Sequence, residues 1–191
     1  MSKHVTVIVG SLREGSYNRK LACTLTELAP EGLEFSFVRT GELPLYNPDL
    51  DEGTPPEAWQ SFRRCVGRSD AILFVTPEYN RSVPANLKNA LDVGSRPMGE
   101  SVWDGKPSAI VTGSPGGIGG FGANHHLRQS LVFLNAAPMQ QPEAYIGNIA
   151  KLFDEEGRLT NEGTKDFLKG FMQAFAAWIE KLTLGEEGGR R

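Results

Sequence analysis

The sequence predicts a three-layer α/β fold, in which one parallel β-sheet lies between two layers of helices. Two observations support this prediction. Short runs that suit strands alternate with longer segments that suit helices over nearly the whole chain of 191 residues. Residues 71–75 (AILFV) are apolar at every position, and strands buried on both faces occur almost only in parallel sheets that helices cover.

The amino-terminal half begins with a buried strand and a helix. Residues 5–9 (VTVIV) form an apolar run, and residues 19–28 follow with the spacing of a helix that packs on one face. Residues 33–38 predict a second strand. Proline and acidic residues are frequent from 43 to 56, which favours a loop, and residues 57–66 predict a helix.

The carboxyl-terminal half continues this alternation. The expected strands are residues 71–75, 108–112 and 138–146, and the expected helices are residues 84–93, 123–134 and 160–182. Pro84 suits the first turn of its helix, where no N–H group is needed. Together the units predict a doubly wound, five-stranded parallel sheet of the flavodoxin type. We expect one domain over residues 1–184 and a disordered tail over 185–191.

Composition excludes several classes of protein. The formal net charge is −3, which gives no reason to expect a nucleic-acid partner. The two cysteines, Cys23 and Cys65, form no metal-ligand cluster; we expect buried thiols, no bound metal and a reducing compartment. The first residues show no signal-peptide segment, and no apolar run approaches the roughly 20 residues of a membrane span. A cytoplasmic protein without a membrane partner is therefore expected.

Ligands of such sheets bind at the carboxyl ends of the strands, which selects three loops. The first, residues 11–18, joins a strand to a helix N-terminus, where free N–H groups and the helix dipole favour a phosphate. Ser11, Ser16 and Asn18 add neutral donors, and Arg13 adds a cation. Ser16 and Asn18 are also residues that cap helices, which is compatible with phosphate binding.

The second loop, residues 76–83, is rigid and partly aromatic. Pro77 and Tyr79 can form an apolar wall for a planar ring, and the Asn80 side chain can contact the edge of that ring. The backbone of Glu78 and Tyr79 can do the same. The Glu78 carboxylate admits two interpretations: a general base, or a carboxylate that caps a helix or faces solvent.

The third loop, residues 113–122, is rich in glycine, which lets the backbone approach a flat ligand. Residues 117–122 also match G-x-G-x-x-G, the dinucleotide fingerprint, with Glu143 a little over 20 residues further on. An NAD-binding dehydrogenase is therefore an alternative, although the match follows the fourth strand rather than the first. His125 and His126 are adjacent, so they point to different faces and are poor joint metal ligands.

Three motifs together resemble one family. They are residues 10–18 (GSLREGSYN), residues 76–80 (TPEYN) followed by 84–92 (PANLKNALD), and residues 114–120 followed by 126–129 (HLRQ). In this order they resemble the NADPH-dependent FMN reductases, and within them the bacterial NAD(P)H quinone and chromate reductases. The resemblance extends over nearly the whole chain.

The resemblance implies a site for FMN. The phosphate would be held by Ser11, Arg13, Ser16, Tyr17 and Asn18. The isoalloxazine ring would be lined by Pro77, Glu78, Tyr79 and Asn80, and the ring and ribityl chain by Ser114, Gly116 and Gly117. It also implies a homodimer that pairs into a homotetramer.

The implied activity is FMN-dependent oxidation of NADPH or NADH by ping-pong hydride transfer. Quinones, flavins, azo compounds or metal oxyanions such as chromate would be the electron acceptors. No catalytic side chain is expected, because the cofactor performs the chemistry. A flavodoxin-type electron carrier is the other alternative; such carriers are usually strongly acidic, which a charge of −3 does not match.

Overall fold

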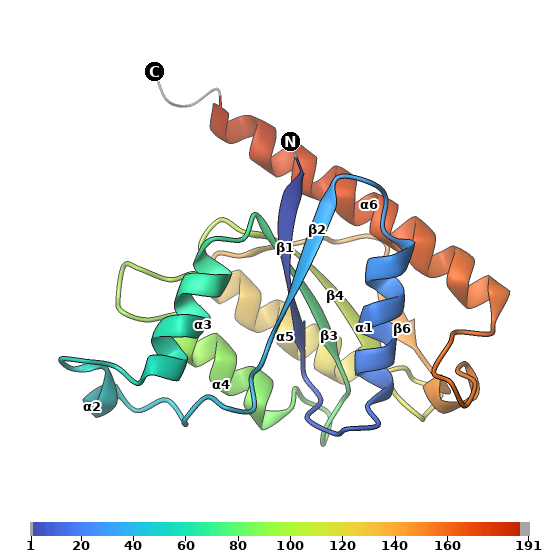
Figure 1. Cartoon of the computed structure of the whole chain (residues 1–191), viewed down its shortest axis with the longest axis horizontal. Coiled ribbons are helices and arrows are strands. Elements are labelled where there is room, and N and C mark those ends of the chain that lie inside the picture. Colours follow the sequence, from blue (N-terminus) through green and yellow to red (C-terminus); the bar gives the residue numbers. More distant parts are fainter. Residues whose placement is uncertain (1, 188–191) are drawn as a thin grey trace.

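The computed structural model describes residues 2–187 and contains a parallel sheet in the order β2-β1-β3-β4-β5, with β6 paired to β4 (Figure 1). The strands are β1 (Lys3–Val9), β2 (Leu33–Val38), β3 (Ala71–Thr76), β4 (Pro107–Gly113), β5 (Ala137–Pro138) and β6 (Ala144–Ile146). The helices are α1 (Tyr17–Leu28), α2 (Pro48–Asp51), α3 (Glu57–Gly67), α4 (Ala85–Gly94), α5 (Phe121–Phe133) and α6 (Glu162–Glu187), with a 3-10 turn η1 (Ile149–Lys151).

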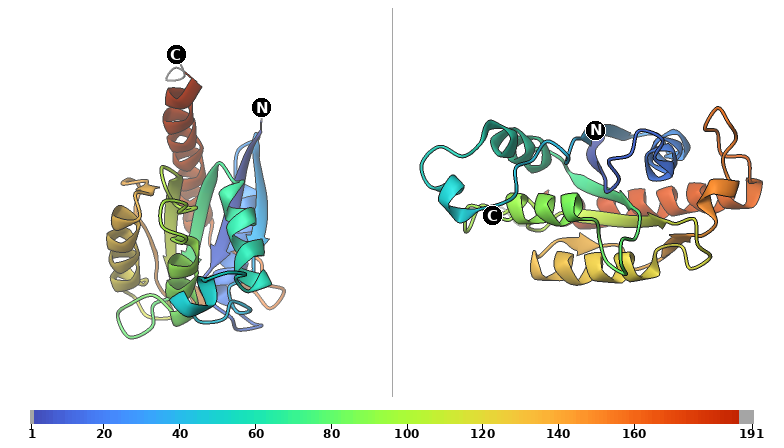
Figure 2. Two further views of the ribbon diagram at one scale, coloured as in Figure 1. Left: turned by 90° about the vertical axis from the view of Figure 1, so that its left-hand side faces the viewer. Right: turned by 90° about the horizontal axis from the view of Figure 1, so that it is seen from below.

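Each face of the sheet has its own hydrophobic cluster. On one face α1 and α6 pack through residues such as Leu25 and Phe171, and on the other face α3, α4 and α5 pack through residues such as Trp59 and Leu131. Seen from the carboxyl ends of the strands, the two helix layers lie on opposite sides of the sheet (Figure 2). All residues of β3 and β4 are buried, whereas β2 is a partly exposed edge. The predicted three-layer flavodoxin-type fold is confirmed.

The predicted fifth strand is present as two short pieces. Pro107 of β4 pairs with Ala137, and Val111 pairs with Ala144, so the register shifts by three residues between β5 and β6. Pro142 lies within this interruption and has no N–H group to donate to β4. The predicted fifth strand over residues 138–146 therefore lies beside β4 as expected, but it is interrupted between β5 and β6.

Smaller differences have local causes. Helix α1 begins two residues earlier than predicted because Ser16 caps it, and a short helix, α2, forms in the predicted loop. Helix α6 extends to Glu187 and so includes the first residues of the predicted tail, 185–191. Residues 188–191 of that tail lie outside the described part of the chain. Cys23 is exposed and Cys65 is half-buried, so the expectation of buried thiols was wrong. No described helix is long and apolar enough to cross a membrane.

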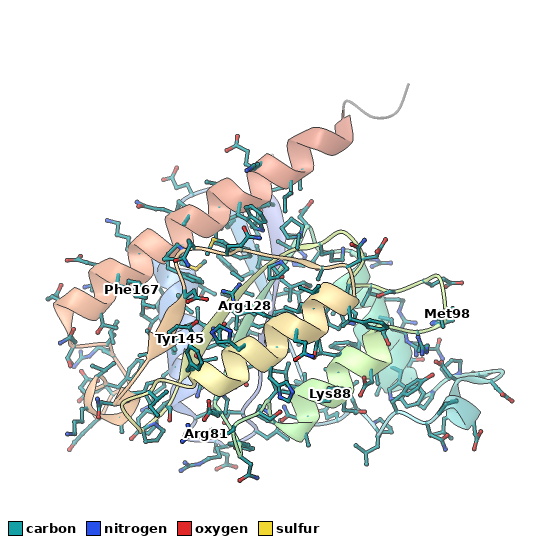
Figure 3. The ribbon with its side chains drawn as sticks, turned by 180° about the vertical axis from the view of Figure 1, so that it is seen from behind. Arg81, Lys88, Met98, Arg128, Tyr145 and Phe167 are labelled. Carbon is teal, nitrogen blue, oxygen red and sulfur yellow. The ribbon has the colours of Figure 1, made fainter. Side chains whose placement is uncertain are left out.

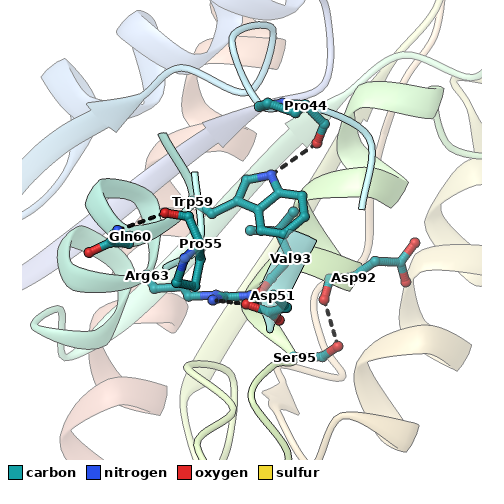
Figure 4. A network of polar contacts seen from close by, with 9 residues as sticks. All are labelled: Pro44, Asp51, Pro55, Trp59, Gln60, Arg63, Asp92, Val93 and Ser95. Atoms are coloured by element: carbon teal, nitrogen blue, oxygen red, sulfur yellow. Dashed lines mark hydrogen bonds and ion pairs between the residues drawn. The ribbon is translucent and has the colours of Figure 1, made fainter. Parts of the chain in front are cut away.

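The segment after β2 is held against α3 by polar contacts (Figure 4). The Trp59 indole N–H donates to the carbonyl oxygen of Pro44 (3.0 Å). Both terminal nitrogens of Arg63 donate to the Asp51 carboxylate (2.8 Å each), and its Nε donates to the carbonyl oxygen of Val93 (2.9 Å). The side chains of Arg63 and Asp51 are only 12% and 11% exposed. The hydrogen bonds from Arg63 lower the pKa of Asp51, against the opposing effect of burial.

Replacing Asp51 with Asn should destabilise the protein by about 2 kcal/mol, because a largely buried guanidinium loses its charged partner. The folded pKa of Asp51 lies below its ordinary value near 3.8. The contribution of this pair is therefore full above the unfolded pKa and is lost as the pH falls through the folded pKa. Urea unfolding at about pH 7 and about pH 3 should show a difference between wild type and Asp51→Asn that shrinks in acid. Asp49→Asn, on an exposed side chain of the same helix, is the control; equal losses in both variants would contradict the assignment.

Candidate functional site

The first of three loops at the carboxyl edge of the sheet turns sharply at Gly10. The Gly10 N–H group donates to the carbonyl oxygen of Val75, near the end of β3 (2.9 Å). A Cβ atom at Gly10 would clash with the Thr76 hydroxyl. Only glycine allows this close approach, which makes the loops after β1 and β3 begin side by side.

The N-terminus of α1 presents free backbone donors. The Ser16 hydroxyl caps the helix by accepting from the Arg19 N–H group (3.2 Å). In the described part of the chain, the N–H groups of residues 11–15, Tyr17 and Asn18 donate to no other group. The first turn contains no acidic residue. Free donors and the positive end of the helix dipole together make this loop suitable for an anion.

The first two residues of α1 have different surroundings. Asn18 is buried, and its amide donates to the carbonyl oxygen of Gly113 at the end of β4 (3.0 Å), while its Oδ1 atom is buried without a partner. The Tyr17 ring stacks on Phe153 (6.3 Å between ring centres) and lies under the Lys20 ammonium (5.5 Å). Tyr17 can therefore reach a ligand in the loop through its backbone rather than its ring.

The loop after β3 closes in a two-residue turn. Tyr79 and Ser82 exchange backbone hydrogen bonds (2.9 and 3.0 Å), and Asn80 and Arg81 between them both have positive φ angles (50° and 63°). Two positive φ angles are typical of a type I′ turn. Asn tolerates this conformation, whereas Arg is held in it at a cost of about 1–2 kcal/mol.

The Glu78 carboxylate caps α5. One oxygen accepts from the Ala123 N–H group in the first turn of α5 (3.1 Å), and the other accepts from the Arg81 guanidinium (3.0 Å). The side chain is 12% exposed. Both oxygens therefore have structural partners, which favours the helix-capping interpretation over the general base.

The glycines of the third loop are explained by packing. A Cβ atom at Gly119 would lie 2.6 Å from the backbone of Tyr145, and one at Gly120 would lie 2.9 Å from the Thr112 side chain. Both glycines also have positive φ angles. The Ser114 hydroxyl accepts from the Gly116 N–H group (3.2 Å) and stabilises the start of the loop.

A hollow of about 390 Å³ opens between the second and third loops. Its lining residues are Glu78, Asn80, Arg81, Ser114, Gly116, Gly117, Ile118 and Gly120. Five of these were expected from the sequence; Arg81, Ile118 and Gly120 were not. The signal for Arg81 in the sequence is its place inside the second loop, directly after Asn80.

The first loop faces other hollows. Ser11 and Arg13 line one of about 320 Å³ beside β2, and Ser16 lines one of about 620 Å³ between α1 and residues 156–159. Arg13 has no ion-pair partner among residues 2–187. The structure thus places the expected phosphate residues next to the expected ring residues, but in separate hollows.

The adjacent histidines contact different partners. His125 Nε2 lies 3.1 Å from the Tyr145 hydroxyl, and His126 Nδ1 lies 2.7 Å from the Ser82 hydroxyl. Burial and the neighbouring Glu143 carboxylate raise the pKa of Tyr145 to about 12, so the phenol stays protonated. Tyr145 lies beside α5 (Figure 3). Among the described residues, no group of three or more His, Cys, Asp or Glu side chains could hold a metal ion.

The doubly wound sheet, with a loop of free backbone donors beside an open hollow, defines a flavodoxin-like class of proteins, whose ligands bind at this edge of the sheet. Comparison with known proteins identifies the family. The sequence model of the NADPH-dependent FMN reductases matches residues 4–151, and the chain belongs to that family.

Curated relatives match almost end to end. A quinone reductase of Pseudomonas putida is 61% identical over 176 residues, which cover 92% of this chain and 94% of the relative. A 2-hydroxy-1,4-benzoquinone reductase of a Burkholderia species is 46% identical over 179 residues, with 94% and 97% covered.

A solved structure agrees with these relatives. FerB of Paracoccus denitrificans, a flavoenzyme NAD(P)H:acceptor oxidoreductase, is 45% identical with a TM-score of 0.88, over 94% of this chain and 98% of that chain. The predicted enzyme class, an oxidoreductase that uses FMN and NAD(P)H, is confirmed.

Two variants of Glu78 test whether its carboxylate acts as a helix cap or as a general base. Glu78→Gln keeps an acceptor for the Ala123 N–H group, whereas Glu78→Ala loses the cap and should destabilise the protein by about 1 kcal/mol. Thermal unfolding and NADPH oxidation should both be measured. We expect Glu78→Gln to lose less than about tenfold in kcat; the loss of a general base would lower kcat by roughly 10²–10⁴-fold.

Proposed function

We propose that this protein is an NAD(P)H-dependent quinone reductase that binds FMN across the three loops at the carboxyl edge of its sheet. The observation that carries the proposal is the set of free backbone donors at the N-terminus of α1, beside Arg13, which has no ion-pair partner within residues 2–187, in a chain of the FMN reductase family.

The first loop fits the FMN phosphate. Its free N–H groups and the hydroxyls of Ser11 and Ser16 can donate to phosphate oxygens, and Arg13 supplies a positive charge. Tyr17 would contribute its N–H group. The buried, unpartnered Oδ1 atom of Asn18 can accept from a hydroxyl of the ribityl chain, which would satisfy it.

The hollow between the other two loops fits the ring. Its volume of about 390 Å³ lies within the usual range for a small-molecule site. Gly116 and Gly117 have no side chains to obstruct a flat ligand, and Ser114 and Asn80 add polar groups at the edge. Pro77 and Tyr79 flank Glu78 in the second loop, and Glu78 fixes this loop to α5.

Bound FMN supplies the hydride-transfer chemistry. The chain itself binds and orients: Glu78 and the turn after β3 hold one wall of the hollow, and the residue 114–120 segment holds the other. No acid–base pair lines the hollow, since the Glu78 carboxylate is occupied at the helix end. An open hollow that nicotinamide and acceptor use in turn supports a ping-pong reaction.

Quinones are the proposed acceptors, because the relatives that match nearly end to end are named for quinone reduction. Free flavins, azo compounds and chromate are further proposed acceptors of an open site. Membership of an NADPH-dependent family disfavours the electron-carrier alternative, and the packing roles of Gly119 and Gly120 disfavour the dehydrogenase alternative.

We also propose a homodimer that pairs into a homotetramer, in the cytoplasm. Helix α5 carries large apolar side chains in contact with solvent, among them Val132 (70% exposed) and Phe133 (89% exposed). Exposed apolar patches of this kind favour protein interfaces. Unpaired thiols at Cys23 and Cys65 suit a reducing compartment.

The purified protein should be yellow, should bleach anaerobically on addition of NADPH without a helper reductase, and should recover its colour with 1,4-benzoquinone. Steady-state rates with a quinone, free FMN, an azo dye and chromate, each with NADH and NADPH, rank the acceptors. Colourless protein that cannot be reconstituted with FMN would refute the proposal.

Arg13→Ala should weaken FMN binding by about 1.5–3 kcal/mol, the value of one charge-assisted hydrogen bond. Fluorescence titration of the apoprotein with FMN gives the dissociation constant. Arg64→Ala, on α3 and paired with Glu57, is the control and should bind FMN as wild type does. Unchanged affinity in Arg13→Ala would remove Arg13 from the phosphate site.

A further inference from the structure

Arg81 occupies a position where glycine would be unstrained. Its φ angle is 63°, and the backbone bonds between Tyr79 and Ser82 hold the turn in place. Gly122 packs against the same turn, because a Cβ atom there would lie 3.0 Å from the Arg81 carbonyl oxygen. The fold thus sustains a strained Arg in the wall of the hollow, and strain of this kind often accompanies function.

The charges at the hollow are arranged unequally. Of the residues that the structure describes, Glu78 and Arg81 are the only charged ones that line it. The Glu78 side chain is 12% exposed and has one oxygen on the Ala123 N–H group, whereas the Arg81 side chain is 73% exposed. One N–H group of the Arg81 guanidinium donates to the second Glu78 oxygen (3.0 Å), and the rest of this exposed side chain faces an incoming ligand, while the carboxylate is fixed at the end of α5.

Other groups at the hollow suit an aromatic anion. Within residues 2–187, the N–H groups of Gly117 and Ile118 donate to no other group and are available to a negative charge. The Ile118 side chain is 60% exposed and offers an apolar contact. Arg81 projects from its loop at the margin of the molecule, where an acceptor can approach (Figure 3).

We propose that Arg81 is a specificity-determining residue that gives this enzyme a preference for negatively charged quinones over neutral quinones of the same size. The favoured class comprises hydroxyquinones, which are vinylogous acids and ionise readily, and quinones with a carboxylate or sulfonate group. The proposal rests on the proposed function, because it requires a quinone that lies against the FMN ring at the open side of the hollow, where Arg81 is exposed.

The test compares 1,4-naphthoquinone with 1,4-naphthoquinone-2-sulfonate on the FMN-loaded enzyme. In Arg81→Gly the ratio of kcat/KM for the sulfonate to that for the neutral quinone should fall roughly fivefold, as for a partly exposed charge contact. The melting temperature should rise, because glycine relieves the positive φ angle. Arg81→Lys, which keeps the charge, should restore part of the ratio.

Binding without turnover gives an independent measurement. Calorimetric titration of the oxidised holoenzyme with 2-hydroxy-1,4-naphthoquinone should show the same loss in Arg81→Gly, and added salt should reduce the difference from wild type. Arg158→Ala removes an equally exposed cation (74%) from another loop and should leave the ratio unchanged.

The outcomes are distinguishable. If wild type reduces both quinones and Arg81→Gly leaves their ratio unchanged, the inference about Arg81 is wrong. A fall in kcat/KM for NADPH without any fall for the sulfonate would assign Arg81 to the nicotinamide substrate instead and would also overturn it. A wild-type holoenzyme that reduces neither quinone contradicts the proposed function itself.

Discussion

The parallel register of β1, β3 and β4 is the constraint on which the candidate site depends. Val9 pairs with Val75, and Thr76 pairs with Thr112, so the three strands end at nearly the same level. Three loops that are distant in sequence therefore leave the sheet within two strand spacings, about 10 Å. A slip of one residue would move each apolar side chain from its own cluster to the cluster on the other face and disturb the packing of both, so the core that stabilises the sheet also positions the loops.

Side chains of one loop satisfy backbone groups of the next. Asn18 at the start of α1 donates to Gly113 at the end of β4, and Glu78 after β3 accepts from Ala123 at the start of α5. These contacts connect helix ends to neighbouring strands before any ligand binds. A loop that is already ordered loses less conformational entropy on binding, which favours affinity without additional contacts.

Alternation of apolar runs and helical segments was sufficient to predict the layers, the parallel sheet and the three loops. What the sequence could not show depends on tertiary contacts. The Glu78 carboxylate has its partner at Ala123, 45 residues away, and the Tyr17 ring stacks on Phe153, which is distant in the sequence. The break in the fifth strand arises from the three-residue shift between the pairing of β5 and that of β6 with β4, and the presence of Pro142 alone did not indicate this shift.

The N-termini of α1 and α5 both lie at this edge of the sheet, and they differ in their charged neighbours. Helix α1 has free N–H groups and no acidic residue in its first turn, whereas the Glu78 carboxylate already occupies an N–H group in the first turn of α5. A pyrophosphate at α5 would meet this negative charge and would find a donor already used. The glycine pattern of residues 117–122 thus lacks the electrostatics of a dinucleotide site, while the N-terminus of α1 has free donors and no acidic residue in its first turn, as the proposed phosphate site requires. The loop of residues 11–18 and the glycine pattern of residues 117–122 both suggest a phosphate site from sequence, and the Glu78 carboxylate from a neighbouring loop distinguishes them.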